Sequence, residues 1–388
     1  MSERIYLDHA ATTPARPEVV EAMLPYFTQG AFNPSSLHAE GRQAREALDR
    51  AREALANHLG ARPKEITFTG GGSEADNLAI LGVSRALQGR GKHIITTTIE
   101  HHAVAHAFDL LESEGWSVTR LGVDRRGVLE PGAFAQALTP QTTFASIMLA
   151  NNEIGTLQPI AELAEMAHAR GVLVHSDAVQ ACGQIPIDVG GLGVDLLSIS
   201  AHKFYGPKGI GALFVREGTP LVPLVLGGGQ EYGRRAGTEN LAGAVGMARA
   251  LELALADMPE TAARVSALRD RLQAGILSSI DDVVVNGAQA ERLPNNCNVG
   301  FGRLNAETLL MRLDLEGVAV STGSACASGT FEPSHVMNAL GLDLDHARGV
   351  LRFSLGRQTS AADIERVLAL LPGVIAGVRA FRTAAIRS

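Results

Sequence analysis

The stretch SISAHKFYGP, residues 198–207, decides the fold together with VLVHSDAVQ, residues 172–180. An apolar run typical of a buried strand leads to Lys203 in the first stretch and to Asp177 in the second. The carboxyl ends of successive parallel strands meet at one edge of a sheet, where open α/β folds bind ligands. A lysine and a buried acid at that edge are what a pyridoxal phosphate (PLP) site requires, because the lysine binds PLP and the acid keeps its pyridine nitrogen protonated. A solvated lysine and a structural salt bridge of Asp177 would fit the same residues.

Length and composition describe an ordinary α/β protein. The chain has 388 residues, more than one core usually supports, so two domains are expected. Its net charge of −7 argues against a nucleic-acid binder, and no apolar run approaches the ~20 residues of a membrane helix. The three cysteines are too few and too scattered for a disulfide framework or a zinc site. The first residues lack the shape of a signal peptide, so we expect a cytoplasmic protein.

Strand-like and helix-like segments alternate between about residues 60 and 255. Short apolar runs without strict alternation are typical of strands buried on both faces, which predicts a mainly parallel sheet. A long helix is expected from about Pro259 to Ile280, followed by further short strands and helices. The pattern predicts a large domain over residues 15–257 and a smaller α+β domain made of residues 1–14 and 258–388.

A glycine-rich loop, TGGGSEADN at residues 69–77, joins a predicted strand to a predicted helix. Glycines let the backbone approach a ligand closely, and the N–H groups at the start of a helix favour an anion. Gly72 and Ser73 would therefore bind the phosphate of PLP, with Ser200 and His202 beside them as further donors. A plain glycine turn that caps the helix is the alternative for this loop.

Four polar residues on other predicted loops and strands could complete such a site. His101 follows a strand, and its imidazole could stack on the pyridine ring and exchange protons, although helix capping would also explain it. A metal site is not expected there, because no third ligand stands at a suitable spacing. Asn152 and Gln180 could hydrogen-bond the phenolic oxygen of the ring, or could merely stabilise their loops. Arg352 could hold a substrate carboxylate with its planar fork, or could pair with an internal acid.

Cys326 stands in the loop STGSACASGT, residues 321–330, where no neighbour is large enough to cover it. Small residues and glycines predict a mobile, exposed loop, and an exposed thiol is a liability unless its chemistry is used. Cys182 and Cys297 lie in apolar or strand-like sequence instead, which is typical of buried and inert thiols. The sequence therefore singles out Cys326 as a reactive thiol.

Taken together, these segments resemble the cysteine desulfurases of the NifS/IscS group, within the class V aminotransferase-like PLP enzymes. The resemblance implies the α/β fold of PLP-dependent transferases of fold type I, the aspartate aminotransferase type. The long loop around Cys326 resembles that of the group I desulfurases. The motifs run in the family's order over nearly the whole chain: YLDHAATTP (6–14), the loop at 71–77, EHHAV (100–104), NNEIG (151–155), HSDAVQ (175–180), SAHK (200–203), RRAGTEN (234–240) and the loop of Cys326.

The resemblance also implies roles for individual residues. Lys203 would bind PLP and act as a base, Asp177 would bond the pyridine nitrogen, and His101 would stack on the ring. Cys326 would take the sulfur of L-cysteine as a persulfide, with release of L-alanine, and Arg352 would bind the substrate carboxylate. Further contacts to cofactor or substrate are implied for Gly72, Ser73, Asn152, Gln180, Ser200 and His202. Thr238 would reach the phosphate bound by a neighbouring subunit, which implies a homodimer.

Several alternatives stay open at this point. A selenocysteine lyase or a transaminase could use the same fold, and formation of alanine from cysteine without a keto acid would separate them from a desulfurase. A non-catalytic platform for assembly partners is a further alternative, although Lys203 and Cys326 are both present. The sulfur acceptor could be an iron–sulfur scaffold, a tRNA thiolation protein or a molybdopterin pathway protein. Cys326 could also be a transient iron–sulfur ligand, and no other metal ligand is expected.

Overall fold

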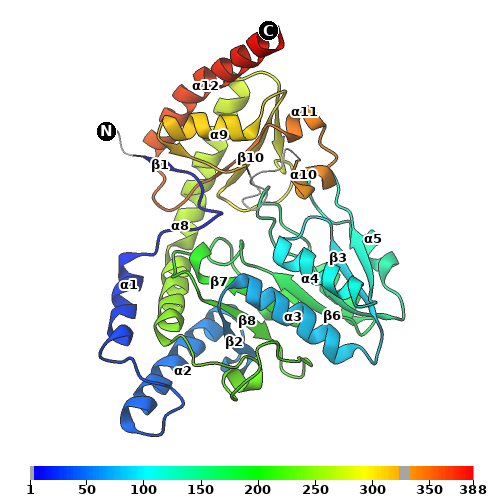
Figure 1. Cartoon of the computed structure of the whole chain (residues 1–388), viewed down its shortest axis with the longest axis vertical. Coiled ribbons are helices and arrows are strands. Elements are labelled where there is room, and N and C mark those ends of the chain that lie inside the picture. The colour runs from blue at the N-terminus through cyan, green and yellow to red at the C-terminus, as the bar shows by residue number, and fades with distance from the viewer. Residues whose placement is uncertain (1–3, 323–332, 388) are drawn as a thin grey trace.

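The computed structural model describes residues 4–322 and 333–387, with side chains up to residue 380. Its elements form two groups around separate sheets, and the long helix α8 (Leu241–Ser279) runs from one group into the other (Figure 1). Cys326 lies outside the described residues, so what the sequence predicts for its loop stays a prediction.

The larger sheet has seven strands in the order β2-β8-β7-β6-β5-β3-β4. Strands β3 to β7 run parallel to one another, whereas β8 pairs antiparallel with both β2 and β7. The mainly parallel sheet is therefore confirmed. The strand bounds are β2 (Ile66–Thr69), β3 (His93–Thr97), β4 (Ser117–Leu121), β5 (Thr142–Ser146), β6 (Leu173–Asp177), β7 (Leu196–Ser200) and β8 (Gly211–Val215).

Helices cover both faces of this sheet, because successive residues of a strand point to opposite faces. Ile94 and Phe144 pack in a cluster with α3 and α4, whereas their neighbours Ile95 and Ala145 pack in a cluster with α2, α6 and α8. The helical elements of this group are α1 (Pro17–Met23), α2 (Ala39–Leu59), α3 (Gly72–Leu87), α4 (His102–Ser113), α5 (Pro131–Ala137), α6 (Ile160–His168) and α7 (Val189–Leu192), with 3-10 turns η1 (Leu24–Phe27), η2 (Pro63–Glu65), η3 (Ala201–Lys203) and η4 (Glu231–Gly233).

The smaller group contains an antiparallel sheet of order β12-β10-β9 and a parallel pair, β1 with β11. Asp8 forms a parallel bridge with Ser354, so the N-terminal segment is joined to the edge of this sheet. The element bounds are β1 (Ile5–Tyr6), β9 (Val283–Asn286), β10 (Asn296–Phe301), β11 (Val318–Ala319), β12 (Val350–Ser354), α9 (Ala306–Leu315), α10 (His335–Ala339), α11 (Leu344–Ala347) and α12 (Ala361–Arg387).

Helix α8 differs from the sequence-based expectation. We expected a helix that begins near Pro259, but α8 begins at Leu241 and keeps Pro259 inside it, so this prediction was wrong at the N-terminal end. The Asn240 side chain accepts a hydrogen bond from the N–H of Gly243 at 2.9 Å, which caps the true start. Met247 packs in the core of the larger sheet and Leu272 in the core of the smaller group. Packing on both sides of the proline therefore offsets the hydrogen bond that it cannot make.

Candidate active site

A pocket of about 500 Å³ opens at the carboxyl edge of the larger sheet, beside the glycine loop that precedes α3. Four predicted phosphate-binding residues line it: Gly72, Ser73, Ser200 and His202. Thr12 and Lys208 are among the lining residues that were not predicted. A Cβ atom on Gly72 would lie 2.7 Å from Cγ2 of Val179, so a larger residue would not fit there without a shift. Nothing lies within 4 Å of the position that a Cβ atom of Gly71 would take, so the loop faces open space.

Lys203 is the last residue of the short turn η3, which follows β7 directly. Its Nζ atom donates hydrogen bonds to the carbonyl oxygens of Ala10 at 2.6 Å and Ala11 at 2.8 Å. Burial lowers the pKa of the Lys203 ammonium to about 8, and the nearby positive charge of Arg352 lowers it further. A substantial fraction of this amine is therefore neutral, and able to act as a nucleophile or base, near pH 8.

Asp177 ends β6, and its Oδ1 atom accepts the N–H of Val179 at 2.8 Å. Burial raises the pKa of its carboxyl to about 6, although the charge of Lys203 opposes that shift. Within residues 4–322 and 333–380, no salt bridge of Asp177 is seen. Asp76 is also buried nearby. Its burial, together with repulsion from the charge of Asp177, raises the pKa of the Asp76 carboxyl well above the usual range. A buried carboxylate is stabilised by a cationic partner, so Asp177 is suited to bind one.

His101 lies at the N-cap position of α4, where its Nδ1 atom accepts the N–H of Ala103 at 3.1 Å. His101 therefore caps a helix, and it also lies close enough to Lys203 for the charge of the amine to act on it. Its stacking on the pyridine ring stays a prediction. Burial lowers the pKa of the imidazole to about 4, and the charge of Lys203 adds to this effect. His101 is thus a neutral ring near Lys203 at pH 7.

The N-terminal segment forms one wall of the site. The Gln180 side chain donates to the carbonyl oxygen of Ala10 at 3.0 Å, the same oxygen that accepts from Lys203. His202 Nδ1 lies 3.1 Å from Oγ1 of Thr12, and the N–H of Thr13 donates to the carbonyl of His202 at 2.9 Å. These contacts bring Gln180, Lys203 and His202 together around one short stretch of backbone.

Arg352 is buried on β12, and within the described part of the chain it contacts the backbone of Asn152 and the side chain of Asp8. Its Nη1 atom donates to the carbonyl oxygen of Asn152 at 2.8 Å, and its Nη2 atom pairs with Oδ1 of Asp8 at 2.8 Å. The internal acid that the sequence left as an alternative partner therefore exists. The contact also brings the backbone of Asn152 to the same place as the guanidinium.

Glu153, next to Asn152, links the two groups of elements. The side chains of Asn296 and Asn298 on β10 donate to its carbonyl oxygen, each at 3.1 Å. Ser334 Oγ donates to its carboxylate at 2.7 Å, and burial raises the pKa of that carboxyl. Ser334 is therefore held against Glu153, next to the start of α10.

The residues around the pocket fit PLP. The glycine loop and the start of α3 suit a phosphate, and the buried acid Asp177 suits a protonated pyridine nitrogen. The Lys203 amine lies at the end of the neighbouring strand in a partly neutral state, as covalent attachment to an aldehyde requires.

Of the predicted site residues that the structure describes, only Gly72, Ser73, Ser200 and His202 line the pocket itself. Two predicted residues are not placed by the contacts described above. Cys326 lies outside the described residues. Thr238 is exposed after η4 and is absent from the residues that line the pocket of its own subunit.

Cys182 and Cys297 are buried, and burial raises the pKa of each thiol to about 12. Within residues 4–322 and 333–387, no group of three or more His, Cys, Asp or Glu residues is arranged to hold a metal ion, and no helix could cross a membrane.

The sequence analysis missed Asp8, Thr12 and Asp76 as members of the site. Asp8 and Thr12 stand in the YLDHAATTP motif, which was noted only as a whole. Asp76 is a buried residue in the first turns of α3, the helix that follows the glycine loop. Its Oδ1 atom lies 3.7 Å from Nε2 of His175. Helical spacing from Ser73 could have indicated it.

Comparisons with known proteins agree with this geometry. The family described as "Aminotransferase class-V" matches residues 5–367. Cysteine desulfurase IscS of Dictyoglomus turgidum is 50% identical over 379 residues, which cover 98% of this chain and 96% of the relative. Cysteine desulfurase IscS of Methanosarcina thermophila is 48% identical over 97% of this chain and 93% of its own. A solved NifS-like protein superimposes with a TM-score of 0.91 at 36% identity, covering 96% of this chain and 99% of that one.

The chain therefore belongs to the class V aminotransferase family of PLP-dependent enzymes, and within that family to the NifS/IscS type of cysteine desulfurase. The predictions of the family, of an α/β fold of type I and of PLP as the cofactor are confirmed.

Proposed function

We propose that this enzyme removes sulfur from L-cysteine, releases L-alanine and leaves the sulfur as a persulfide on Cys326. One observation carries the proposal: the Lys203 amine, the phosphate cradle and the Arg352 guanidinium converge on the N-terminal segment at one edge of the sheet. An amino acid bound through its carboxylate at Arg352 would thus lie next to Lys203.

PLP would be held by residues from five segments. Lys203 would bind it covalently, Asp177 would bond its pyridine nitrogen, and the neutral ring of His101 would lie on its face. Bound PLP supplies the electron sink that makes the Cα proton of the substrate removable. The remaining contacts are assigned to Gly72, Ser73, Ser200 and His202 at the phosphate, and to Asn152 and Gln180 at the ring hydroxyl.

Proton transfer is assigned to the Nζ atom of Lys203. Its lowered pKa of about 8 leaves enough neutral amine to accept the Cα proton near physiological pH. Arg352 would fix the substrate carboxylate and so orient the Cα–H bond toward Lys203. The roles of His101 and Lys203 are compatible, because a neutral imidazole beside the amine adds no positive charge that would lower its basicity further.

The sulfur step is assigned to the thiolate of Cys326. The thiolate attacks the Sγ atom of the substrate, the new S–S bond forms, and the Cβ–S bond of the substrate breaks. The electron pair of that bond stays with the carbon fragment, which gains protons and leaves as L-alanine. The products are one alanine and one persulfide for each cysteine, so no external oxidant is required.

The domain limits and the dimer are also part of the proposal. Separate apolar cores support a large domain over residues 15–257 and a small domain over residues 1–14 and 258–388. A homodimer is supported by Thr238, which is exposed and does not line the pocket of its own subunit, and by exposed apolar side chains that a partner subunit would cover. These side chains are Leu24, Phe27, Leu37, Val225 and Leu226. We also propose that the enzyme works in the cytoplasm and passes sulfur to an iron–sulfur scaffold protein.

Mass spectrometry tests the central claim. Purified holoenzyme is incubated with L-cysteine, and alkylated peptides are searched for a persulfide. We expect it on Cys326, together with alanine formed without a keto acid. Cys326→Ser should keep bound PLP and lose both products, whereas Cys182→Ser is the matched control and should keep both. A persulfide confined to another cysteine, or alanine formed only with a keto acid, would contradict the proposal.

A further inference from the structure

Asp8 occupies the place on Arg352 that a substrate carboxylate would need. Its Oδ1 atom lies 2.8 Å from Nη2 of Arg352, and the two side chains are 22% and 3% exposed. A guanidinium binds a carboxylate best through two parallel N–H groups, and both of its bidentate edges include Nη2. The carbonyl oxygen of Asn152 already accepts from Nη1. Asp8 and an incoming carboxylate are therefore competitors for the same side of Arg352.

The backbone of Asp8 is fixed, so any exchange would be a movement of its side chain. The N–H of Ser354 donates to the carbonyl of Leu7 at 2.8 Å, and the N–H of His9 donates to the carbonyl of Ser354 at 3.2 Å. The Tyr6 hydroxyl donates to the carbonyl oxygen of Asp8 at 3.0 Å. The Asp8 carboxylate itself is partly exposed, which leaves it a route into water.

The same segment reaches the reacting amine. Two residues after Asp8, the carbonyl oxygens of Ala10 and Ala11 accept from Nζ of Lys203. The charges that act on Lys203 come from Arg352, Asp177 and Asp8. If a substrate carboxylate replaces the Asp8 carboxylate on Arg352, the charge next to that guanidinium is the same before and after binding.

We propose that Asp8 is a positioning residue that holds the place of the substrate carboxylate on Arg352 and yields it when an amino acid binds. The return of Asp8 to Arg352 then helps the product to leave, since L-alanine carries the same carboxylate. Asp8 thereby sets how tightly the enzyme retains any ligand with an α-carboxylate. This inference rests on the proposed role of Arg352.

A ligand without an amine separates carboxylate binding from chemistry. 3-Mercaptopropionate carries the carboxylate and thiol of cysteine but cannot react with PLP through an amine. Its Kd is measured by calorimetry on the holoenzyme. Asp8→Asn keeps an acceptor for Arg352 and removes the competing charge, so we expect the Kd to fall about fivefold, the value of one partly exposed charge pair. An equal or higher Kd would overturn the role of Asp8.

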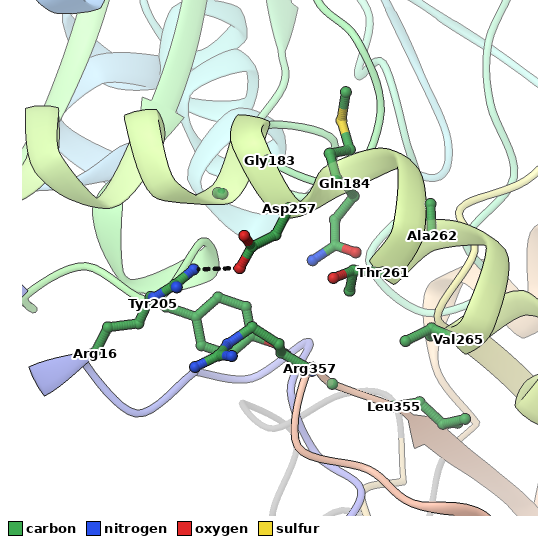
Figure 2. Close-up of a pocket in the computed structure, with 13 residues that line it drawn as sticks. Arg16, Gly183, Gln184, Tyr205, Asp257, Thr261, Ala262, Val265, Leu355 and Arg357 are labelled. Atoms are coloured by element: carbon green, nitrogen blue, oxygen red, sulfur yellow. Dashed lines mark hydrogen bonds and ion pairs between the residues drawn. The ribbon is translucent and has the colours of Figure 1, made fainter. Parts of the chain in front are cut away.

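Two further variants make the result specific. Arg352→Gln should raise the Kd of 3-mercaptopropionate at least about tenfold, and if it does not, the role of Arg352 in the proposed function fails rather than that of Asp8 alone. Asp257 provides the matched control, because it pairs with the buried Arg16 at the same 2.8 Å beside a separate cavity (Figure 2). Asp257→Asn should leave the Kd unchanged.

Kinetics supply a second readout that a purely structural role would not move. In Asp8→Asn, L-alanine should inhibit at about fivefold lower concentration and the KM for L-cysteine should fall, while kcat falls with slower product release. Asp8→Ser, which is smaller and also uncharged, gives the same test should the asparagine variant not fold. A KM that rises in a folded, PLP-loaded variant of either kind would contradict the exchange.

Discussion

Glu231 provides a sharp test of how the glycine loop is held in place. Its carboxylate pairs with Arg52 through contacts of 2.6 and 2.8 Å, and it accepts the N–H of Phe68 at 2.9 Å. Arg52 also donates to the carbonyl of Ile66 at 2.7 Å. The two side chains are only 3% and 2% exposed. This ion pair therefore ties α2 to β2, the strand that leads into the glycine loop.

The cost of breaking the pair follows from its burial. Removing one partner of a buried ion pair destabilises a protein by about 3–5 kcal/mol, because the other charge is left without compensation. Glu231→Gln keeps an oxygen that can accept from Phe68 or Arg52, so we expect the lower end, about 3 kcal/mol. The aromatic rings of Phe68 and Tyr232 lie 4.8 and 5.2 Å from the guanidinium and would compensate only a small part.

Trp116 is the only tryptophan and is buried in the core of the larger sheet, so its fluorescence reports unfolding of that half. With a slope of about 3 kcal/mol per M, the urea midpoint should fall by about 1 M. Glu46→Gln is the control, because Glu46 pairs with Arg50 at an exposed position of α2 and should not shift the midpoint. A midpoint in Glu231→Gln that matches this control would refute the reasoning.

Three further predictions concern proton transfer and the Cys326 segment. Burial raises the pKa of Glu100 to about 8. Between the ordinary pKa of a glutamate and this value, the folded protein keeps a proton that the unfolded chain has lost, so the free energy of unfolding should fall as pH rises from about 5 to 8. Glu100→Gln should flatten this dependence in thermal melts between those pH values. The pKa of Lys203, about 8, predicts that PLP uptake by the apoenzyme quickens with pH up to about 8 and then levels off; uptake that keeps rising toward pH 10 would contradict it. Ser334→Ala removes the donor to the buried Glu153 carboxylate, so persulfide formation on Cys326 should slow about tenfold in rapid-quench mass spectrometry, with PLP absorbance unchanged.

The sequence predicted those parts of the fold that local pattern controls. The bounds of β2 and β3 agree with their apolar runs, and α3 begins at the glycine loop as its composition indicates. Asp177 ends β6 and Lys203 follows β7 by three residues, as their apolar runs indicate, and β6 and β7 are parallel neighbours with Asp177 opposite Ser198. Local pattern therefore fixed the edge of the sheet at which ligand chemistry occurs.

The contacts between distant segments could not be predicted in the same way. Asp8 and Arg352 are 344 residues apart, and no local pattern indicates which acid a strand arginine will meet. The antiparallel direction of β8 and the pairing of Arg52 with Glu231 depend on the folded topology alone. The continuity of α8 through Pro259 was missed because packing against two cores outweighs a local helix breaker.

The N-terminal segment presents different acceptors to Lys203 and to Arg352. Its backbone carbonyls, from Ala10 and Ala11, accept from the amine that is to react, while its only carboxylate in this stretch, from Asp8, faces the guanidinium that is to bind substrate. Carbonyl oxygens can hold an amine in either protonation state of that amine without adding a charge, whereas a carboxylate at Lys203 would stabilise the ammonium and raise its pKa. The segment therefore orders both groups while its carboxylate contacts Arg352 and not Lys203. Burial and the charge of Arg352 lower the pKa of Lys203 more than Asp177 and Asp8 raise it, which leaves part of the amine neutral near pH 8.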